Sequence, residues 1–189
     1  MKVGILALQG DFEAHARVLE RLGVGWSYVK RAEDLGGIDA LILPGGESTT
    51  FLKFLEGNGF AEAVRQLPAQ GKPLFGTCAG AILLAREVTH PPQPSLALVD
   101  VTIERNAYGR QMQSAVRRGR CALKGDPMEM VFIRAPVIRR VGSGVRVLGE
   151  CEGLPVCVEQ DNCLLATFHP ELTRDTTLHE HFLCLAGKP

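Results

Sequence analysis

The sequence has no excess of charge of either sign, because 21 lysine and arginine residues are matched by 21 aspartate and glutamate residues. A chain without a net positive field has little to attract a nucleic acid or an anionic membrane surface. It also lacks any apolar run long enough to cross a bilayer. We therefore expect a small substrate, no nucleic-acid partner and no membrane contact.

Paired metal-binding or redox cysteines are missing as well. The six cysteines are scattered, with no Cys-x-x-Cys pair and no zinc-finger spacing, so we expect no metal site and no disulfide framework. The apolar run 3–8 is stopped by Gln9, Gly10 and Asp11, and no cleavage-like motif follows, which argues against a secretory signal. A reducing, cytoplasmic location is the expected one.

Short apolar runs alternate with helical patterns along most of the chain. The runs 3–8, 39–43 and 74–77 are continuous, which is typical of strands buried on both faces of a parallel sheet. Further strands are predicted at 26–29, 98–103 and 130–133 and as a meander at 145–150, 155–159 and 163–168, with helices at 12–22, 51–55, 60–67 and after residue 78. The polar segment 111–125 is interpreted as a surface excursion.

These patterns predict an α/β fold: a single-domain, flavodoxin-like, doubly wound sheet over residues 1–189, mostly parallel, with a short antiparallel meander near the C-terminus. Local signals add details. Asp11 is expected to cap the first helix, and Thr177 with Glu180 to form a capping box on the last. His15, near the apolar stripe of the first helix, is expected to be a packed or partly exposed side chain.

A nucleophile is indicated where the run 74–77 meets Gly-Thr-Cys-Ala-Gly and a helical apolar pattern. Strand, sharp turn and helix in this order hold Cys78 above the sheet, because the flanking glycines tolerate a strained backbone. A thiolate is a strong nucleophile near neutral pH, and the N–H of Ala79 is a natural oxyanion donor. The alternative is a buried structural thiol.

The loop Pro-Gly-Gly-Glu-Ser-Thr-Thr at 44–50 follows another predicted strand. Two glycines let the backbone approach a ligand with its N–H groups outward, and Ser48 or Thr49 is expected to cap the next helix. No Gly-Lys-Ser/Thr follows, so this is not a phosphate-binding loop, and the Gly-x-Gly-x-x-Gly fingerprint is also absent. We expect oxyanion or carboxylate contacts here; a tight connection without a ligand is the alternative.

The run Phe-His-Pro-Glu at 168–171 ends the last predicted strand. Proline biases His169 toward an extended conformation, in which residues i and i+2 share a face. Glu171 can then accept one ring N–H of His169 and leave the other nitrogen free to take a proton. Because Cys78 and His169 end strands at the same predicted sheet edge, the three side chains together predict an acyl-transfer site.

Five motifs resemble the triad glutamine amidotransferases, and more narrowly the glutaminase subunits of pyridoxal 5'-phosphate synthase. They follow one another over nearly the whole chain: Pro-Gly-Gly-Glu-Ser-Thr-Thr, Gly-Thr-Cys-Ala-Gly, Arg-Asn-Ala-Tyr-Gly-Arg-Gln, Phe-Ile-Arg-Ala-Pro and Phe-His-Pro-Glu-Leu-Thr. The resemblance implies hydrolysis of L-glutamine to L-glutamate and ammonia without a cofactor. It also implies transfer of the ammonia to a separate synthase subunit, which makes pyridoxal 5'-phosphate as a product.

The resemblance also implies roles for individual residues. Cys78, His169 and Glu171 would form the catalytic triad, and the N–H groups of Gly46 and Ala79 would form the oxyanion hole. L-Glutamine would be held by Gly46, Glu47, Ser48, Arg105, Ile133 and Arg134. The chain departs from the family's usual sequence at 112–117 and at Ala81, which leaves partner contacts near those segments open.

Two other interpretations remain. A stand-alone cysteine hydrolase or repair protein of the same flavodoxin-like architecture would also have a cysteine on a sharp turn, but it would need neither Arg105 for glutamine nor a synthase partner. A non-enzymatic regulatory binding module would leave Cys78 unreactive. A glutaminase assay with and without a synthase, and labelling of Cys78 by a glutamine-like chloroketone, distinguish these possibilities.

Overall fold

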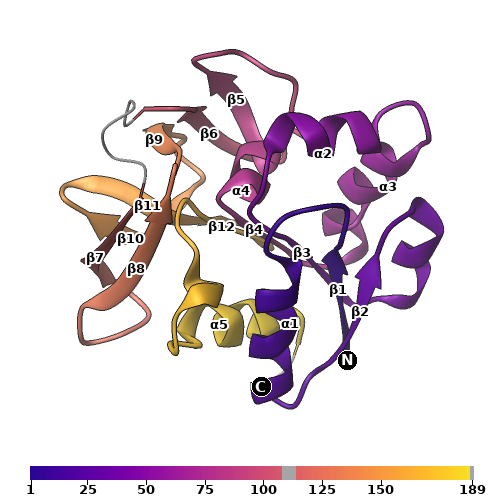
Figure 1. Ribbon diagram of the computed structural model, residues 1–189, viewed down its shortest axis with the longest axis horizontal. Coiled ribbons are helices and arrows are strands. Elements are labelled where there is room, and N and C mark those ends of the chain that lie inside the picture. The colour runs from indigo at the N-terminus through magenta and orange to yellow at the C-terminus, as the bar shows by residue number, and fades with distance from the viewer. Residues whose placement is uncertain (108–113, 188–189) are drawn as a thin grey trace.

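A computed structural model describes residues 1–107 and 114–187 (Figure 1). Its main sheet has nine strands in the order β2-β1-β3-β4-β12-β11-β10-β7-β8. The first five in this order are parallel: β1 (Lys2–Leu6), β2 (Gly25–Val29), β3 (Ala40–Leu43), β4 (Leu74–Thr77) and β12 (Cys163–Ala166). Counted along the chain, their order is 2-1-3-4-5, which is the flavodoxin-like order that the sequence predicts.

The sheet continues beyond β12 with antiparallel strands. They are β11 (Leu154–Gln160), β10 (Arg146–Cys151), β7 (Ser114–Cys121) and β8 (Met128–Ile133). The predicted meander corresponds to β10, β11 and β12. The surface excursion expected at 111–125 is wrong for 114–121, because β7 pairs with both β8 and β10. Arg117 on its covered face and the exposed Val116 on the other break the apolar–polar alternation that marks a strand.

A second sheet has three strands in the order β5-β6-β9. They are β5 (Ala85–Thr89), β6 (Val99–Glu104) and β9 (Val137–Val141). Only β6 is predicted from the sequence. β5 follows directly on a helix and reads Ala-Arg-Glu-Val-Thr, with two adjacent exposed charged residues, and β9 is short and carries two adjacent arginines, so neither shows a clear period. The motif residues Tyr108, Gly109, Arg110 and Gln111, with residues 112 and 113, lie outside the described part of the chain.

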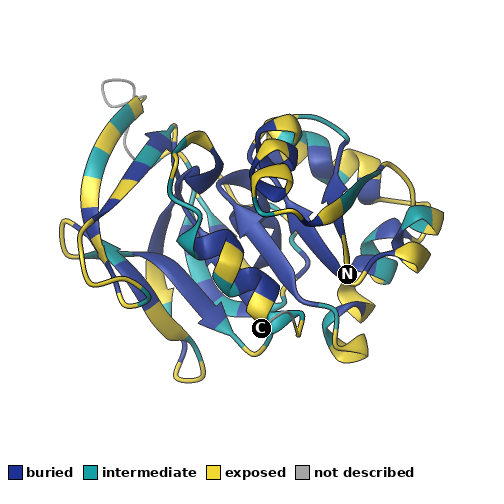
Figure 2. Ribbon diagram, turned by 90° about the horizontal axis from the view of Figure 1, so that it is seen from below, coloured by how far each residue is buried: buried dark blue, intermediate teal, exposed yellow. Residues whose placement is uncertain are grey.

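Helices cover both faces of the parallel half of the sheet (Figure 1). α1 (Phe12–Arg21) and α5 (Thr177–Leu185) lie on one face, and α2 (Ser48–Leu55), α3 (Phe60–Gln66) and α4 (Ala79–Leu84) on the other. Successive strand residues alternate between two buried clusters: Leu41 and Leu43 join the cluster of Phe51, while Ile42 joins that of Phe182. The central strands are therefore buried on both sides (Figure 2), as their continuous apolar sequences predict.

Two helix starts differ from the expected ones, because a carboxylate one or two residues away competes for the free N–H groups. Glu47, not Ser48 or Thr49, is the N-cap of α2, and its Oε1 accepts a hydrogen bond from the Thr49 N–H at 3.5 Å. The N-cap of α5 is Thr176, while Asp175 Oδ1 accepts from the N–H of Thr177 at 2.9 Å. Within the described ranges, no helix is long and apolar enough to cross a membrane.

Candidate active site

The carboxyl ends of β4 and β12 bring Cys78 and His169 to the same edge of the sheet. Thr77 pairs with Ala166, and the Cys78 N–H donates to the carbonyl of Ala166 at 2.9 Å. Cys78 itself has φ 48° and ψ −102°, a strained turn between β4 and α4. A Cβ at Gly80 would lie 1.9 Å from the carbonyl oxygen of Leu43. Only glycine fits there, so the sharp turn that the sequence predicts is a close-packed one.

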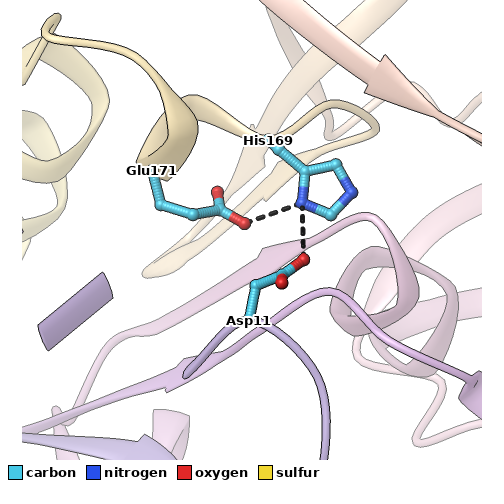
Figure 3. Close-up of side chains that lie close together, drawn as sticks. All are labelled: Asp11, His169 and Glu171. Carbon is cyan, nitrogen blue, oxygen red and sulfur yellow. Dashed lines mark hydrogen bonds and ion pairs between the residues drawn. The ribbon is translucent and has the colours of Figure 1, made fainter. Parts of the chain in front are cut away.

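His169 is buried beside Glu171, and the two are hydrogen bonded (Figure 3). Glu171 Oε1 accepts from His169 Nδ1 at 2.8 Å, as expected. The expected reason is wrong, however. Residues Pro170–Leu172 form a 3-10 turn, η3, instead of continuing an extended chain, and this turn folds the carboxylate back onto the imidazole. Pro170 at the start of that turn has the φ that a helical turn requires.

The surroundings of His169 favour its charged form. Burial on its own lowers the pKa of this imidazole, but hydrogen bonds to Cys78 and Glu171, together with their charges, outweigh burial and raise the pKa of His169 to about 10. Burial raises the pKa of Glu171 in turn, although the bond to His169 opposes that shift. At neutral pH the imidazole of His169 is therefore protonated, the state that supplies a proton to a leaving group.

Asp11 is a second carboxylate near the same ring nitrogen (Figure 3). Its Oδ2 lies 3.5 Å from His169 Nδ1. Asp11 occupies the N-cap position of α1, but its side chain makes no capping hydrogen bond, so the expected cap is wrong. Ligand atoms of Asp11, His169 and Glu171 all lie within 4.8 Å of one another and could approach one cation. His169 Nδ1 is already hydrogen bonded to Glu171. The same contacts are therefore equally explained, without a cation, by an imidazole held between two carboxylates.

The glycine loop between β3 and α2 lies directly against this imidazole. A Cβ on Gly45 would be 2.3 Å from His169 Cε1 and 3.0 Å from Nδ1. The next residue, Gly46, has φ 152°, and the Gln9 side chain donates from Nε2 to the carbonyl oxygen of Glu47 at 2.9 Å. Loops that follow β1 and β3 therefore meet here, at the point where open α/β sheets bind ligands.

Replacing Gly45 with alanine is expected to lower turnover by about 10-fold or more, because a ring displaced by even an ångström loses its alignment with the Cys78 sulfur. The change is measured as kcat. Gly36→Ala is the matched control, since a Cβ at Gly36 meets nothing within 4 Å. Equal kcat values for the two variants would show that the loop does not constrain His169.

A pocket of about 70 Å³ opens in front of the thiol. It is lined by Gly46, Glu47, Ser48, Cys78, Ile82, Arg105, Asn106, Ile133, Arg134 and Pro136. All six residues expected to hold glutamine are in this set. Arg105 Nη2 lies 3.3 Å from Glu47 Oε1, and Cys78 Sγ lies 3.9 Å from the carbonyl oxygen of Ile133. His169, which is hydrogen bonded to Cys78, and Glu171 do not line this pocket, and Ala79 begins α4 directly after Cys78.

Several residues of the site are not indicated by the sequence. Ile82 belongs to the apolar face of its helix, and Asn106 and Pro136 fall within motifs that carry the family resemblance but have no role assigned from the sequence. His15 is fully buried, in line with the packed side chain that the sequence predicts, but it packs against Glu171, with Nε2 at 3.5 Å from Oε1. That contact forms because α1 packs against η3 in the folded chain, so the sequence alone does not indicate it.

A thiol, an imidazole and a carboxylate at neighbouring strand ends, beside a glycine loop, are typical of enzymes that transfer acyl groups through a cysteine. The chain belongs to the SNO glutamine amidotransferase family, which it matches over residues 5–186. It is accordingly a glutamine amidotransferase.

Known relatives are similar to this protein over nearly its whole chain. Pyridoxal 5'-phosphate synthase subunit PdxT of Koribacter versatilis is 54% identical over 183 residues, covering 97% of this chain and 94% of the relative. The protein of the same name from a strain of Thermus thermophilus is 52% identical and covers 98% of this chain and 97% of the relative. A crystal structure described as a glutamine amidotransferase superposes with a TM-score of 0.92 at 48% identity, covering 98% of this chain and 99% of that one.

Proposed function

We propose that this chain is the glutaminase subunit of a pyridoxal 5'-phosphate synthase. It hydrolyses L-glutamine to L-glutamate and ammonia, and a separate synthase subunit takes up the ammonia. Residues 1–189 act as one amidotransferase domain, and the enzyme works in the cytoplasm without a cofactor. The full-length similarity to PdxT proteins supports the partner and the substrate.

One observation carries the catalytic part of the proposal. The pocket lined by Cys78 has Arg105 and Glu47 as an ion pair on its wall, while His169 is hydrogen bonded to Cys78. A free amino acid carries a carboxylate and an ammonium group, and this pair offers one partner to each. The side-chain amide of the bound amino acid is then the group that faces the sulfur.

In the first half of the reaction, the Cys78 thiolate, which forms when its proton is held by His169, attacks the side-chain carbonyl of glutamine. Negative charge develops on the carbonyl oxygen, where the N–H groups of Gly46 and Ala79 stabilise it. The new C–S bond persists as the C–N bond breaks, and His169 gives its proton to the departing nitrogen, which leaves as ammonia. Glu171 keeps the ring oriented throughout.

In the second half, a γ-glutamyl thioester on Cys78 is hydrolysed. His169, now neutral, accepts a proton from a water molecule, the hydroxide adds to the thioester carbonyl, and the C–S bond breaks to release glutamate. The proton on His169 is again available for the next cycle. The same two N–H groups serve both tetrahedral intermediates.

An ammonia-release assay with and without an added synthase subunit tests the proposal. Glutamine-dependent formation of pyridoxal 5'-phosphate by the mixture, and its absence when the chain is left out, are the expected results. Hydrolysis of other amides or esters at equal rates, with no effect of the synthase, would favour the stand-alone hydrolase of the same fold instead.

Replacing Arg105 with glutamine is expected to raise KM for glutamine by about 10- to 100-fold, because a charged hydrogen bond to the substrate carboxylate is lost. The kcat should change far less, since Arg105 does not touch the reacting amide. Steady-state kinetics of the synthase complex give both values. Arg139→Gln, which removes an arginine paired with Glu104 on the second sheet, is the control. A fall in kcat at constant KM would place Arg105 outside the carboxylate site.

A further inference from the structure

Two histidines are completely buried behind the catalytic carboxylate. His15 comes from α1 and His179 from α5, and both are 0% exposed. His15 Nδ1 lies 3.0 Å from His179 Nε2. On its other side, His15 Nε2 lies 3.1 Å from Thr77 Oγ1 and 3.5 Å from Glu171 Oε1. The His15 imidazole thus contacts both Thr77, the residue before Cys78, and Glu171, the carboxylate bonded to His169.

Both rings are neutral at physiological pH. Burial lowers the pKa of His179 to about 3, and burial together with the neighbouring His179 and His169 lowers the pKa of His15 well below its ordinary range. A neutral imidazole has one N–H donor and one lone-pair acceptor. The position of one proton therefore fixes the direction of donation along the whole series of contacts from His179 through His15 to Thr77 and Glu171. Two directions are possible.

In the first direction, His179 donates from Nε2 to His15 Nδ1, and His15 donates from Nε2 toward Thr77 Oγ1 and Glu171 Oε1. In the second, His15 donates from Nδ1 to His179 Nε2, and the His179 proton sits on Nδ1. That Nδ1 is buried and has no hydrogen-bond partner among the described residues. A buried N–H without an acceptor costs free energy, whereas in the first direction the same nitrogen keeps only an unpaired lone pair.

The second direction has another cost. It turns the lone pair of His15 Nε2 toward the Glu171 carboxylate, 3.5 Å away. Besides His15, the titratable groups nearest Glu171 are His169, bonded at 2.8 Å, and Asp11, whose negative charge opposes ionisation of Glu171. A carboxylate that is buried and near another acid needs donors. Only the first direction supplies one from this side.

We propose that His15 is a positioning residue for glutamine hydrolysis: its Nε2–H, bonded to Thr77 Oγ1 and 3.5 Å from Glu171 Oε1, holds the carboxylate in line with His169, and His179 fixes the tautomer that makes this possible. The inference deepens the proposed function and rests on it. It also predicts that the two buried histidines affect the reaction without touching glutamine, since neither lines the pocket.

The test compares His15→Leu, which removes the donor, with His15→Gln, whose side-chain amide can donate from a similar position. In the complex with the synthase subunit, His15→Leu should lower kcat by about 10-fold, the usual size of effect for a lost outer hydrogen bond, with KM changed less than about 2-fold. The alkaline limb of kcat/KM should shift to lower pH, because a misaligned Glu171 supports the imidazolium less. His15→Gln should recover most of kcat, and His90→Leu, an exposed loop histidine, should change nothing.

A second readout does not depend on glutamine. The rate at which iodoacetamide alkylates Cys78 reports on the thiol and imidazole pair, and its pH profile should shift in His15→Leu in the same direction as kcat/KM. If the wild-type complex hydrolyses no glutamine, the proposed function fails, while this alkylation profile still decides the role of His15.

Two outcomes would overturn the inference. One is a folded His15→Leu variant whose kcat and pH profiles are unchanged, or whose lowered kcat is not recovered in His15→Gln. The other needs no variant: nitrogen NMR of the wild-type complex distinguishes the two tautomers, and a His15 ring protonated on Nδ1 instead of Nε2 contradicts the proposal even if His15→Leu does not fold.

Discussion

Replacing Cys78 with alanine is expected to reduce glutamine hydrolysis by about 10⁴-fold or more, as loss of the nucleophile does in other triad enzymes. No other thiol in the described part of the chain lines the pocket, so none can replace it. Binding of glutamine should persist, because the ion pair of Arg105 and Glu47 is untouched. Ammonia release and calorimetric titration with glutamine measure the two effects separately.

Cys184→Ala is the matched control for this substitution. Cys184 is an exposed cysteine on α5, far along the chain from the turn that holds Cys78. Its removal should leave kcat and KM unchanged. Turnover by Cys78→Ala at more than a few per cent of the wild-type rate, with the synthase present, would exclude a covalent mechanism through this thiol.

Replacing His169 with glutamine is expected to lower kcat by about 10³-fold, within the range that general acid and base catalysis contributes. A glutamine residue at position 169 keeps a polar side chain beside Glu171 but cannot carry the proton that the leaving ammonia needs. His181→Gln, a partly exposed histidine on α5, is the control. Equal loss in both variants would point to a general effect on the fold.

The same substitution should change how stability depends on pH. The pKa of His169 rises from the ordinary value of 6.5 to about 10 in the folded chain, so the native state binds this proton more tightly than the unfolded state. Its contribution to the free energy of unfolding is complete below pH 6.5 and is lost as the pH rises through about 10. Denaturant titrations across this window should show a decline that His169→Gln largely lacks. An identical decline in both proteins would contradict the raised pKa.

Much of this site is predictable from the sequence because its parts follow strands. Continuous apolar runs such as that of β3 mark strands buried on both faces, and parallel strands bring their carboxyl ends to one edge. Cys78 comes directly after β4, and His169 follows β12 by three residues. Their approach follows from topology alone, whereas their roles remain predictions until the substitutions above are made.

The antiparallel half of the fold is less predictable. β7 carries Arg117 on its covered side and Val116 on its exposed side, so it has no regular apolar alternation, and its pairing with β8 and β10 depends on contacts distant in the chain. β9 is too short and polar to show a period. Local sequence patterns report only on residues within one helix or strand. They therefore do not predict these strands.

The supporting residues of the site show the same limit. Asp11 and His15 have local explanations as a helix cap and a packed side chain, and each explanation is sufficient without any ligand. Their contacts with His169 and Glu171 arise because α1 packs against the η3 turn, more than a hundred residues later. Nothing near Asp11 or His15 in the sequence indicates that contact.

Mass spectrometry of the synthase complex, quenched in acid within one turnover after mixing with glutamine, tests the account most directly. The expected result is a γ-glutamyl adduct on the peptide that contains Cys78, absent from Cys78→Ala and longer-lived in His169→Gln if that variant still forms it. Release of ammonia and glutamate at the normal rate with no adduct on that peptide at any quench time would contradict the claim that the Cys78 sulfur is the nucleophile.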